Sequence, residues 1–258
     1  MYQNWIFDLY GTLVNIRTDE SNPLLWEKMS AFYSCYGADY AAPQLEEAYH
    51  RICDEEEQKA LAKGCTRAEI DLGIVFERLL KEAPAKHTAS MKTGAMKHWR
   101  YAAASAFRVI SREKLEVYDH VHSTLQTLRD RGCRIYLLSN AQRLFTVPEM
   151  EQLDLVKYFD GIYISSDAGV KKPDPLFMEM LLRKEKLEKS ESVMVGNDFS
   201  ADIASALAGG IDSIFLNTDH YVKMELERRL SKVRMNHDYQ PYLIESGDIA
   251  EVLEIAKE

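Results

Sequence analysis

The stretch NWIFDLYGTLV, residues 4–14, decides the fold of this 258-residue chain. It begins with Trp5 to Phe7, a short apolar run of the length typical of a buried β-strand. Asp8 follows where that strand should end, and Gly11 lets the backbone turn sharply soon afterwards. Ligands of open α/β sheets bind at the C-terminal ends of strands, where a buried carboxylate needs a cation or several donors. Asp8 is therefore either a site residue or the cap of a turn or helix.

Five later runs have the same strand pattern, and helical patterns separate most of them. Strands that alternate with helices predict a parallel sheet with helices on both faces. Polar residues that follow such strands meet at one edge of the sheet. The five runs span residues 133–138, 161–164, 192–195, 213–216 and 241–244.

Residues 16–110 show a different pattern. Apolar side chains recur there every three or four positions, as in amphipathic helices, and Gly37, Gly64 and Pro84 mark the ends of the repeats. The spacing predicts four helices, which begin near residues 24, 43, 66 and 90, and no strand. We therefore expect a doubly wound parallel (Rossmann-like) α/β core, residues 1–15 and 111–258, interrupted by an all-helical cap domain, residues 16–110.

Composition excludes some classes of function. A net charge of −9 argues against non-specific binding to nucleic acid, although a metal and a few local cations would still allow a phosphorylated small molecule. No apolar run approaches the roughly 18 residues of a membrane span, and no signal peptide precedes the first strand. The cysteines lack CxxC spacing, which predicts free thiols and a cytoplasmic protein. They are Cys35, Cys53, Cys65 and Cys133.

Polar residues follow two of the later strands. Ser139 and Asn140 come after the run 133–138, where a hydroxyl and an amide can donate hydrogen bonds to phosphoryl oxygens, or where Ser139 can cap a helix. Lys172 stands before Pro173, after the third strand. A lysine held inward there would neutralise Asp8, whereas a lysine in a solvated loop would have no such partner.

An acidic cluster, GNDFSAD at residues 196–202, follows the fourth strand. Its oxygen donors suit a hard cation such as Mg²⁺, while an acidic helix N-terminus is the alternative. Asn197 with Asp202 is one candidate pair of oxygen ligands in this cluster. Counting by acids alone pairs Asp198 with Asp202, and both registers stay open.

These four motifs, in this order and each after a strand, resemble the haloacid dehalogenase (HAD) superfamily of aspartate-nucleophile hydrolases. The first motif of that family reads Asp-x-(Asp or another residue)-Gly-Thr-Leu, and residues 8–13 read Asp-Leu-Tyr-Gly-Thr-Leu. The resemblance covers essentially the whole chain, although the helical insert matches only in its position and helix content.

The resemblance implies a role for each motif residue. Asp8 would be the nucleophile and Thr12 would orient it, while the insert would close over the cleft, exclude water and select the substrate. The implied catalytic residues are Asp8, Tyr10, Thr12, Ser139 and Lys172. The implied substrate-binding residues are Gly11, Thr12, Ser139, Asn140 and Lys172. Mg²⁺ would be held by Asp8, the main-chain carbonyl of Tyr10, and the fourth-motif residues Asn197, Asp198 and Asp202.

Tyr10 is the departure from the family pattern. Phosphatases of the superfamily usually place a second aspartate there as a general acid and base, whereas a phenol with a pKa of about 10 is a poor base at neutral pH. Haloacid dehalogenases carry a tyrosine at this position. Asn197 also resembles the corresponding residue in the fourth motif of the dehalogenases. However, the first helix of the insert lacks the arginine that a dehalogenase cap offers.

Three interpretations follow. The first is a Mg²⁺-dependent phosphatase that acts on a small phosphorylated metabolite through an aspartyl-phosphate intermediate. The second is a 2-haloacid dehalogenase. The third is a weakly catalytic HAD-like protein that binds a phosphorylated ligand or a partner. The sequence does not identify the substrate or the oligomeric state.

Overall fold

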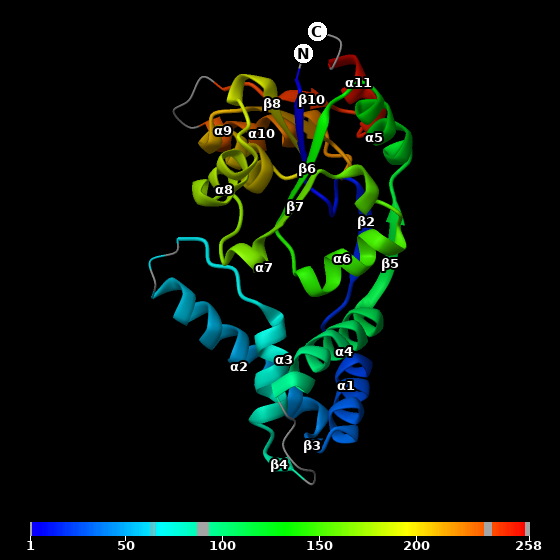
Figure 1. Cartoon of the computed structure of the whole chain (residues 1–258), viewed down its shortest axis with the longest axis vertical. Helices are drawn as coiled ribbons and strands as arrows, with labels where there is room; N and C mark the ends of the chain where they lie inside the picture. The colour runs from blue at the N-terminus through cyan, green and yellow to red at the C-terminus, as the bar shows by residue number, and fades with distance from the viewer. Residues whose placement is uncertain (1, 63, 65, 87–92, 235–238, 256–258) are drawn as a thin grey trace.

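The computed structural model describes residues 2–62, 64, 66–86, 93–234 and 239–255. A six-stranded parallel sheet with helices around it forms one end of the molecule, and a helical insert forms the other (Figure 1). The strand order is β10-β9-β8-β1-β6-β7. The strands are β1 (Asn4–Phe7), β6 (Arg134–Ser139), β7 (Gly161–Ile164), β8 (Ser192–Gly196), β9 (Asp212–Leu216) and β10 (Tyr242–Ile244).

The opening strand of the chain lies in the middle of the sheet. Phe7, the last residue of β1, pairs with Leu137 of β6 on one side and with Val195 of β8 on the other. All four residues of β1 are buried. Since the strands are parallel, Asp8 and the residues that follow β6 and β8 emerge at the same edge of the sheet.

Alternation along β1 divides the core between the two faces of the sheet. Trp5 and Phe7 pack in one apolar cluster with α5 (Val121–Asp130), α6 (Arg143–Gln152) and α11 (Val252–Ile255). Ile6 packs in another with α8 (Pro175–Glu185) and α9 (Ala204–Gly209). Successive side chains of a strand point to opposite faces, so an uninterrupted apolar run indicates a sheet that is covered on both sides. The predicted fold class is confirmed.

The insert contains the four predicted helices: α1 (Pro23–Cys35), α2 (Ala42–Leu61), α3 (Leu72–Lys81) and α4 (Thr93–Ser111). The start predicted near residue 90 lies outside the described residues. Side-chain caps begin two of these helices, because Asn22 accepts from the amide of Leu24 (3.0 Å) and Asp71 accepts from the amide of Gly73 (2.8 Å). The insert has its own apolar core, which is rich in aromatic side chains.

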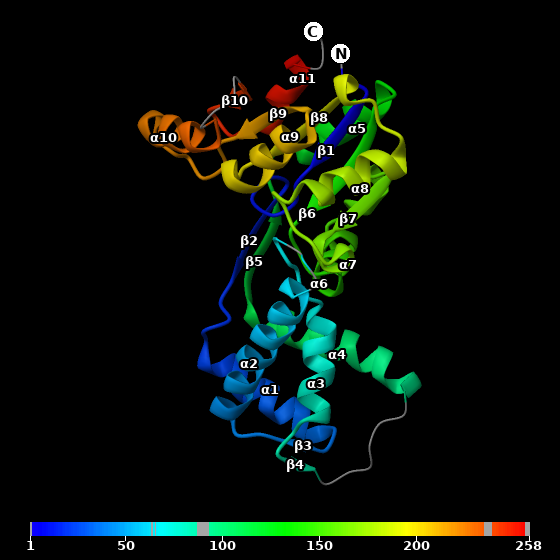
Figure 2. The ribbon, with the colours of Figure 1, turned by 90° about the vertical axis from the view of Figure 1, so that its left-hand side faces the viewer.

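Strands within the insert correct one expectation. β2 (Val14–Thr18) pairs antiparallel with β5 (Arg112–Val117), and this ribbon carries the chain from the sheet to the insert and back (Figure 2). β3 (Ala38–Asp39) pairs with β4 (Ala85–Lys86). The expectation of no strand between residues 16 and 110 was wrong, because partly exposed, polar or two-residue strands lack an apolar pattern. The domain boundaries predicted at residues 15–16 and 110–111 fall at this ribbon and stay a prediction.

Two further helices follow strands of the sheet: α7 (Ser165–Ala168) follows β7, and α10 (Lys223–Arg234) follows β9. Leu226 and Leu230 of α10 pack against Phe215. Among the described helices, none is both long enough and apolar enough to cross a membrane. Cys35, Cys53 and Cys133 are free thiols, and Cys65 lies outside the described residues.

A buried ion-pair cluster joins the insert to the sheet domain. Glu149 of α6 accepts from Arg108 of α4 (2.8 Å) and from Arg112 of β5 (3.0 Å). The Glu149 side chain is only 4% exposed. Burial raises the pKa of Glu149, but the hydrogen bonds and charge of Arg108, together with hydrogen bonds from Tyr10 and Arg112, hold that pKa below its ordinary value of 4.5.

Glu149→Gln should destabilise the protein by about 3 kcal/mol at pH 7, because two partly buried guanidinium groups lose the carboxylate charge that they share. A carboxyl group with a lowered pKa stabilises the folded state above its unfolded pKa and loses that effect as the pH falls. The difference from wild type should therefore shrink below about pH 4.5. Urea unfolding at pH 7 and at acidic pH measures both values.

Glu116→Gln is the matched control, because its ion pair with Lys114 is exposed and should contribute less than about 1 kcal/mol. A Glu149→Gln protein as stable as wild type, or a difference that does not change with pH, would contradict this account of the junction.

Candidate functional site

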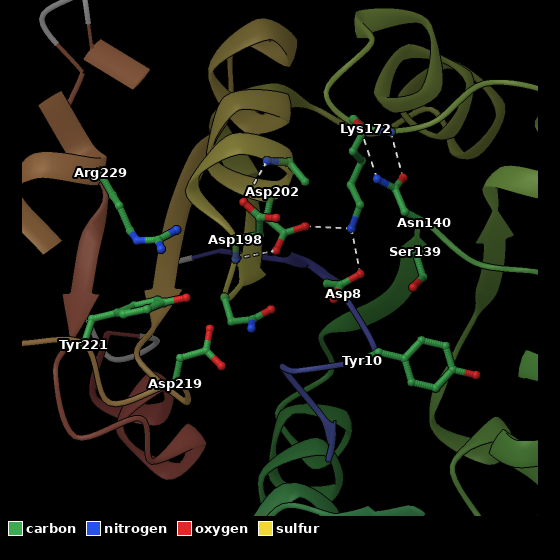
Figure 3. Close-up of a pocket in the computed structure, with 12 residues that line it drawn as sticks. Asp8, Tyr10, Ser139, Asn140, Lys172, Asp198, Asp202, Asp219, Tyr221 and Arg229 are labelled. Carbon is green, nitrogen blue, oxygen red and sulfur yellow. Dashed lines mark hydrogen bonds and ion pairs between the residues drawn. The ribbon is translucent and has the colours of Figure 1, made fainter. Parts of the chain in front are cut away.

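A cavity of about 270 Å³ opens at the C-terminal edge of the sheet (Figure 3). It brings together residues from all four motifs that the sequence singled out, although they lie far apart in the chain. Gly11 and Thr12 are not among the residues that line it. Its lining consists of Asp8, Tyr10, Ser139, Asn140, Lys172, Asn197, Asp198, Ala201, Asp202, Asp219, Tyr221 and Arg229.

Lys172 is the buried cation of this site. Its Nζ donates to Asp8 Oδ1 (2.7 Å), Asp202 Oδ1 (2.6 Å) and the main-chain carbonyl of Leu138 (2.7 Å). The residue is 3% exposed. Burial lowers the pKa of Lys172, but the charges and hydrogen bonds of Asp202 and Asp8 outweigh burial and raise it. Lys172 therefore stays charged and lies inward, not in a solvated loop.

Asn140 positions the lysine. Its Nδ2 donates to the carbonyl of Lys172 (3.1 Å), and its Oδ1 accepts from the amide of Lys172 (2.7 Å). The Asn140 amide group is thus bonded to the loop that carries Lys172. Ser139 is buried and lines the cavity, where its hydroxyl can face a ligand.

Asp202 forms the opposite side of the charged centre. It is 1% exposed, and its Oδ2 accepts from the amide of Asp198 (3.0 Å). Burial raises the pKa of Asp202, and the charge of Lys172 opposes that shift. A Cβ atom at Gly196 would lie 2.2 Å from an Asp202 oxygen, so the close approach of Asp202 to the end of β8 requires glycine at this position.

Asn197 and Asp198 face different partners. Asp198 Oδ1 accepts from the amides of Ser200 (2.7 Å) and Ala201 (3.3 Å), so this carboxylate caps the turn that follows β8. Asn197 Oδ1 instead accepts from the hydroxyl of Thr12 (3.3 Å). The Asn197 side chain packs directly against Gly11, where any Cβ atom would overlap it. The amide side chain therefore contacts the loop that carries Asp8, whereas the Asp198 carboxylate turns away.

Gly11 and Thr12 form the turn of the loop that carries Asp8. The amide of Gly11 donates to the carbonyl of Val14 (2.8 Å), and the amide of Thr12 donates to the carbonyl of Leu9 (3.2 Å). Gly11 has a φ of +85°, a conformation that glycine adopts without strain. These two amides are used by the turn itself, and the contact of Gly11 and Thr12 with a substrate stays a prediction.

Tyr10 directs its ring away from Asp8 and Asp202 (Figure 3). Its hydroxyl donates to Glu149 and lies 3.3 Å from the hydroxyl of Thr146, and Arg108 lies over its ring. Burial and the Glu149 carboxylate raise the pKa of Tyr10, so the phenol stays protonated at neutral pH. The Tyr10 hydroxyl therefore belongs to the junction cluster and is not available as a base in the cavity.

The insert touches the loop that carries Lys172. The amide of Lys171 donates to the carbonyl of Arg67 (3.0 Å), and the amide of Glu69 donates to the carbonyl of Gly169 (3.1 Å). Ala68 and Val170 form an antiparallel bridge between these segments. The connection between α2 and α3 is thus part of the surroundings of the cavity.

Sequence reasoning missed three residues of the cavity wall: Asp219, Tyr221 and Arg229. They belong to no motif, so the pattern search passed over them. The signal that could have found Asp219 and Tyr221 is their place just after β9, since the C-terminal ends of all parallel strands meet at this edge.

The donors around Asp8 suit a hard metal ion. The cavity lining contains carboxylates and an amide oxygen but neither cysteine nor histidine. In the described part of the chain, no three histidine, cysteine, aspartate or glutamate side chains converge as a metal cage. A set of one carboxylate, one main-chain carbonyl and one amide oxygen, completed by water, still fits Mg²⁺, which keeps several waters when bound to proteins.

Comparison with known proteins shows related phosphatases. Pyrimidine 5'-nucleotidase PynA of Streptococcus pneumoniae is 26% identical over 223 residues, which cover 85% of each chain. Ribulose-1,5-bisphosphate 5-phosphatase of Halopiger xanaduensis is 28% identical over 154 residues, 60% of this chain and 61% of that enzyme. Glyceraldehyde 3-phosphate phosphatase of Methanothermobacter thermautotrophicus is 30% identical over 105 residues, 41% of this chain and 46% of that enzyme. The last two matches thus span about half to three fifths of the relatives' length.

Solved structures show the same fold over the whole chain. 2-Haloacid dehalogenase from Pseudomonas syringae superposes with a TM-score of 0.64 at 20% identity and covers 100% of this chain and 99% of its own. The HAD-hydrolase YfnB from Bacillus subtilis, solved with bound magnesium, superposes with a TM-score of 0.53 at 15% identity and equal coverage. The family model described as haloacid dehalogenase-like hydrolase matches residues 4–210, more than half of the chain. The chain therefore belongs to the haloacid dehalogenase-like hydrolases.

Proposed function

We propose that this protein is a Mg²⁺-dependent phosphatase that hydrolyses a small phosphorylated metabolite. The observation that carries the proposal is the buried Lys172, which bonds both Asp8 and Asp202 at the floor of a small open cavity. A fixed cation beside a carboxylate nucleophile can stabilise the charge of a transferring phosphoryl group. Relatives named as phosphatases of small phosphorylated metabolites support this choice.

Asp8 would attack phosphorus with one carboxylate oxygen, and the bond from phosphorus to the ester oxygen would break. Water would then attack the phosphorus of the aspartyl-phosphate, release inorganic phosphate and restore the carboxylate. Lys172 holds the other side of the Asp8 carboxylate through Oδ1. Ser139 lines the cavity wall, and its hydroxyl would donate to a phosphoryl oxygen.

The departing alcohol needs a proton, and Tyr10 is not placed to supply it. Its hydroxyl donates to Glu149, outside the reaction centre. Loss of general acid and base help costs about 10²–10⁴ in rate. We therefore expect slow turnover of alkyl phosphates and faster turnover of esters with good leaving groups, such as aryl phosphates.

Mg²⁺ would be held by the Asp8 carboxylate, the main-chain carbonyl of Tyr10 and the Asn197 amide oxygen. The ion would neutralise charge that develops on the phosphoryl group. Asn197 is preferred to Asp198 because Asn197 packs against the Asp8 loop, whereas Asp198 caps a turn. Asp202 would act through its hydrogen bond to Lys172. The magnesium found in YfnB supports the choice of ion.

Dehalogenation is the second candidate, because Tyr10 and Asn197 match the dehalogenase pattern. Against it, Arg108, which lies over the Tyr10 ring, already donates to Glu149 through both Nε and Nη2, so these donors are not turned to a halo acid. Halide release from 2-chloropropionate tests this candidate directly.

Asp8→Asn should abolish phosphate release from a panel of phosphomonoesters, and EDTA should abolish it in the wild type. The amide is a poor nucleophile but keeps the size of the side chain. Asp248→Asn is the matched control. Asp248 is an acidic residue that caps a helix near the C-terminal end of the chain, so this variant should retain turnover. Metal-independent release, or turnover that persists in Asp8→Asn, would contradict the proposal.

A second pair of variants tests whether Asn197 or Asp198 binds the Mg²⁺ ion. Asn197→Asp adds a negative charge to the ligand set and should lower the Mg²⁺ concentration needed for half-maximal activity. Asp198→Asn retains an oxygen that can cap the turn, so the Mg²⁺ requirement should change little. Titration of activity with Mg²⁺ measures both. The opposite pattern would make Asp198 the ligand.

A further inference from the structure

One wall of the cavity has no role in the proposed reaction. It consists of Asp219 and Tyr221, on the loop after β9, and Arg229 of α10. The buried side chain of Asn217 fixes this loop, because its Nδ2 donates to the carbonyl of Tyr221 (2.9 Å) and its Oδ1 accepts from the amide of Tyr221 (2.8 Å). The hydroxyl of Thr218 donates to the carbonyl of Gly11 (2.5 Å), so the wall is tied to the loop that carries Asp8.

Arg229 is held in a defined orientation over this wall. Its Nε donates to Glu225 Oε1 (2.7 Å), and its guanidinium carbon lies 4.2 Å from the centre of the Tyr221 ring. A guanidinium group stacked on an aromatic ring and bonded through Nε has few ways to turn. Its terminal amino groups point toward the cavity (Figure 3).

The positive charge of Arg229 is only partly neutralised. Glu225, its ion-pair partner among the described residues, also accepts from Arg228 through Nε and Nη2 (2.7 Å each). One carboxylate therefore serves two guanidinium groups. Within the described residues, the terminal amino groups of Arg229 make no hydrogen bond. Such a planar pair of donors matches a carboxylate or phosphate, which it can bind with two parallel bonds.

The two acids on this side of the cavity have other partners. Asp198 caps the turn after β8 through the amides of Ser200 and Ala201. Asp219 lies beside Tyr221 and, after burial, is the main cause of the raised pKa of that phenol. Neither carboxylate forms an ion pair with Arg229 in the described structure. The guanidinium group is thus available to an anion that enters the cavity.

We infer that Arg229, supported by Tyr221, binds a second anionic group of the substrate while its phosphoryl group lies at Asp8 and Lys172. The preferred substrates are then small phosphate monoesters that carry a carboxylate or a second phosphate. This inference rests on the proposed phosphatase function for the place of the phosphoryl group. The cavity of about 270 Å³ has room for a short molecule of this kind.

Binding of phosphonates tests the inference without any turnover, because their carbon–phosphorus bond is not a substrate for ester hydrolysis. Phosphonoacetate carries two anionic groups and ethylphosphonate carries one. We expect calorimetry with Mg²⁺ to show that wild type binds phosphonoacetate about tenfold or more tightly, the size typical of one charged hydrogen-bonded contact. Arg229→Gln should lose that preference.

Arg228→Gln is the matched control, because Arg228 lies on the same helix and bonds the same Glu225 but does not line the cavity. It should keep the preference for phosphonoacetate. Arg229→Lys keeps the charge without the planar donor pair and should retain only part of the preference. Thermal unfolding of each variant shows whether it is folded.

Equal affinity of wild type for the two phosphonates would overturn the inference, as would a preference that survives in folded Arg229→Gln or disappears equally in Arg228→Gln. Hydrolysis assays separate this result from the proposed function. A wild type that prefers phosphonoacetate but hydrolyses no phosphomonoester would keep the Arg229 site and refute the phosphatase proposal. A wild type that hydrolyses phosphomonoesters but binds both phosphonates equally would refute only the inference.

Discussion

The contact of one buried ammonium group with two carboxylates determines how the rest of this structure is arranged. Lys172 is nearly inaccessible to water, and it remains charged because Asp8 and Asp202 surround it. Isolated charges of either sign would be very costly at this depth. Three loops, which follow β1, β7 and β8, must therefore meet at one point, and the parallel sheet is the framework that brings them there.

Much of this arrangement could be predicted from the sequence, because apolar runs indicate buried strands. The residue after each run then lies at the edge of the sheet where the parallel strands end. The positions of Asp8, Ser139, Lys172 and Asp202 followed from that rule together with the motif order. The role of Asn140 did not, because nothing in a local pattern tells whether an amide bonds a ligand or a distant backbone.

Other features were invisible for different physical reasons. β2 and β5 are held by pairing with each other, and their polar residues leave no apolar signature. The orientation of Tyr10 depends on Glu149, far along the chain, whose own place depends on two arginines. Arg229 lies on a helix whose surface pattern resembles any solvated helix, and only the folded chain brings it to the cavity. Contacts of this kind are long-range, so local sequence patterns do not report them.

The pairing of Ala68 with Val170 connects the helical insert to the loop that carries Lys172. The segment of the insert that contains Ala68 hydrogen-bonds both flanks of Val170, and the same core loop then continues into Lys172. Displacement of the insert, to admit a ligand or to release a product, must break these backbone bonds or pull on the loop that carries the cation. The position of the insert and the ion pair between Lys172 and Asp8 are therefore mechanically connected through this one loop.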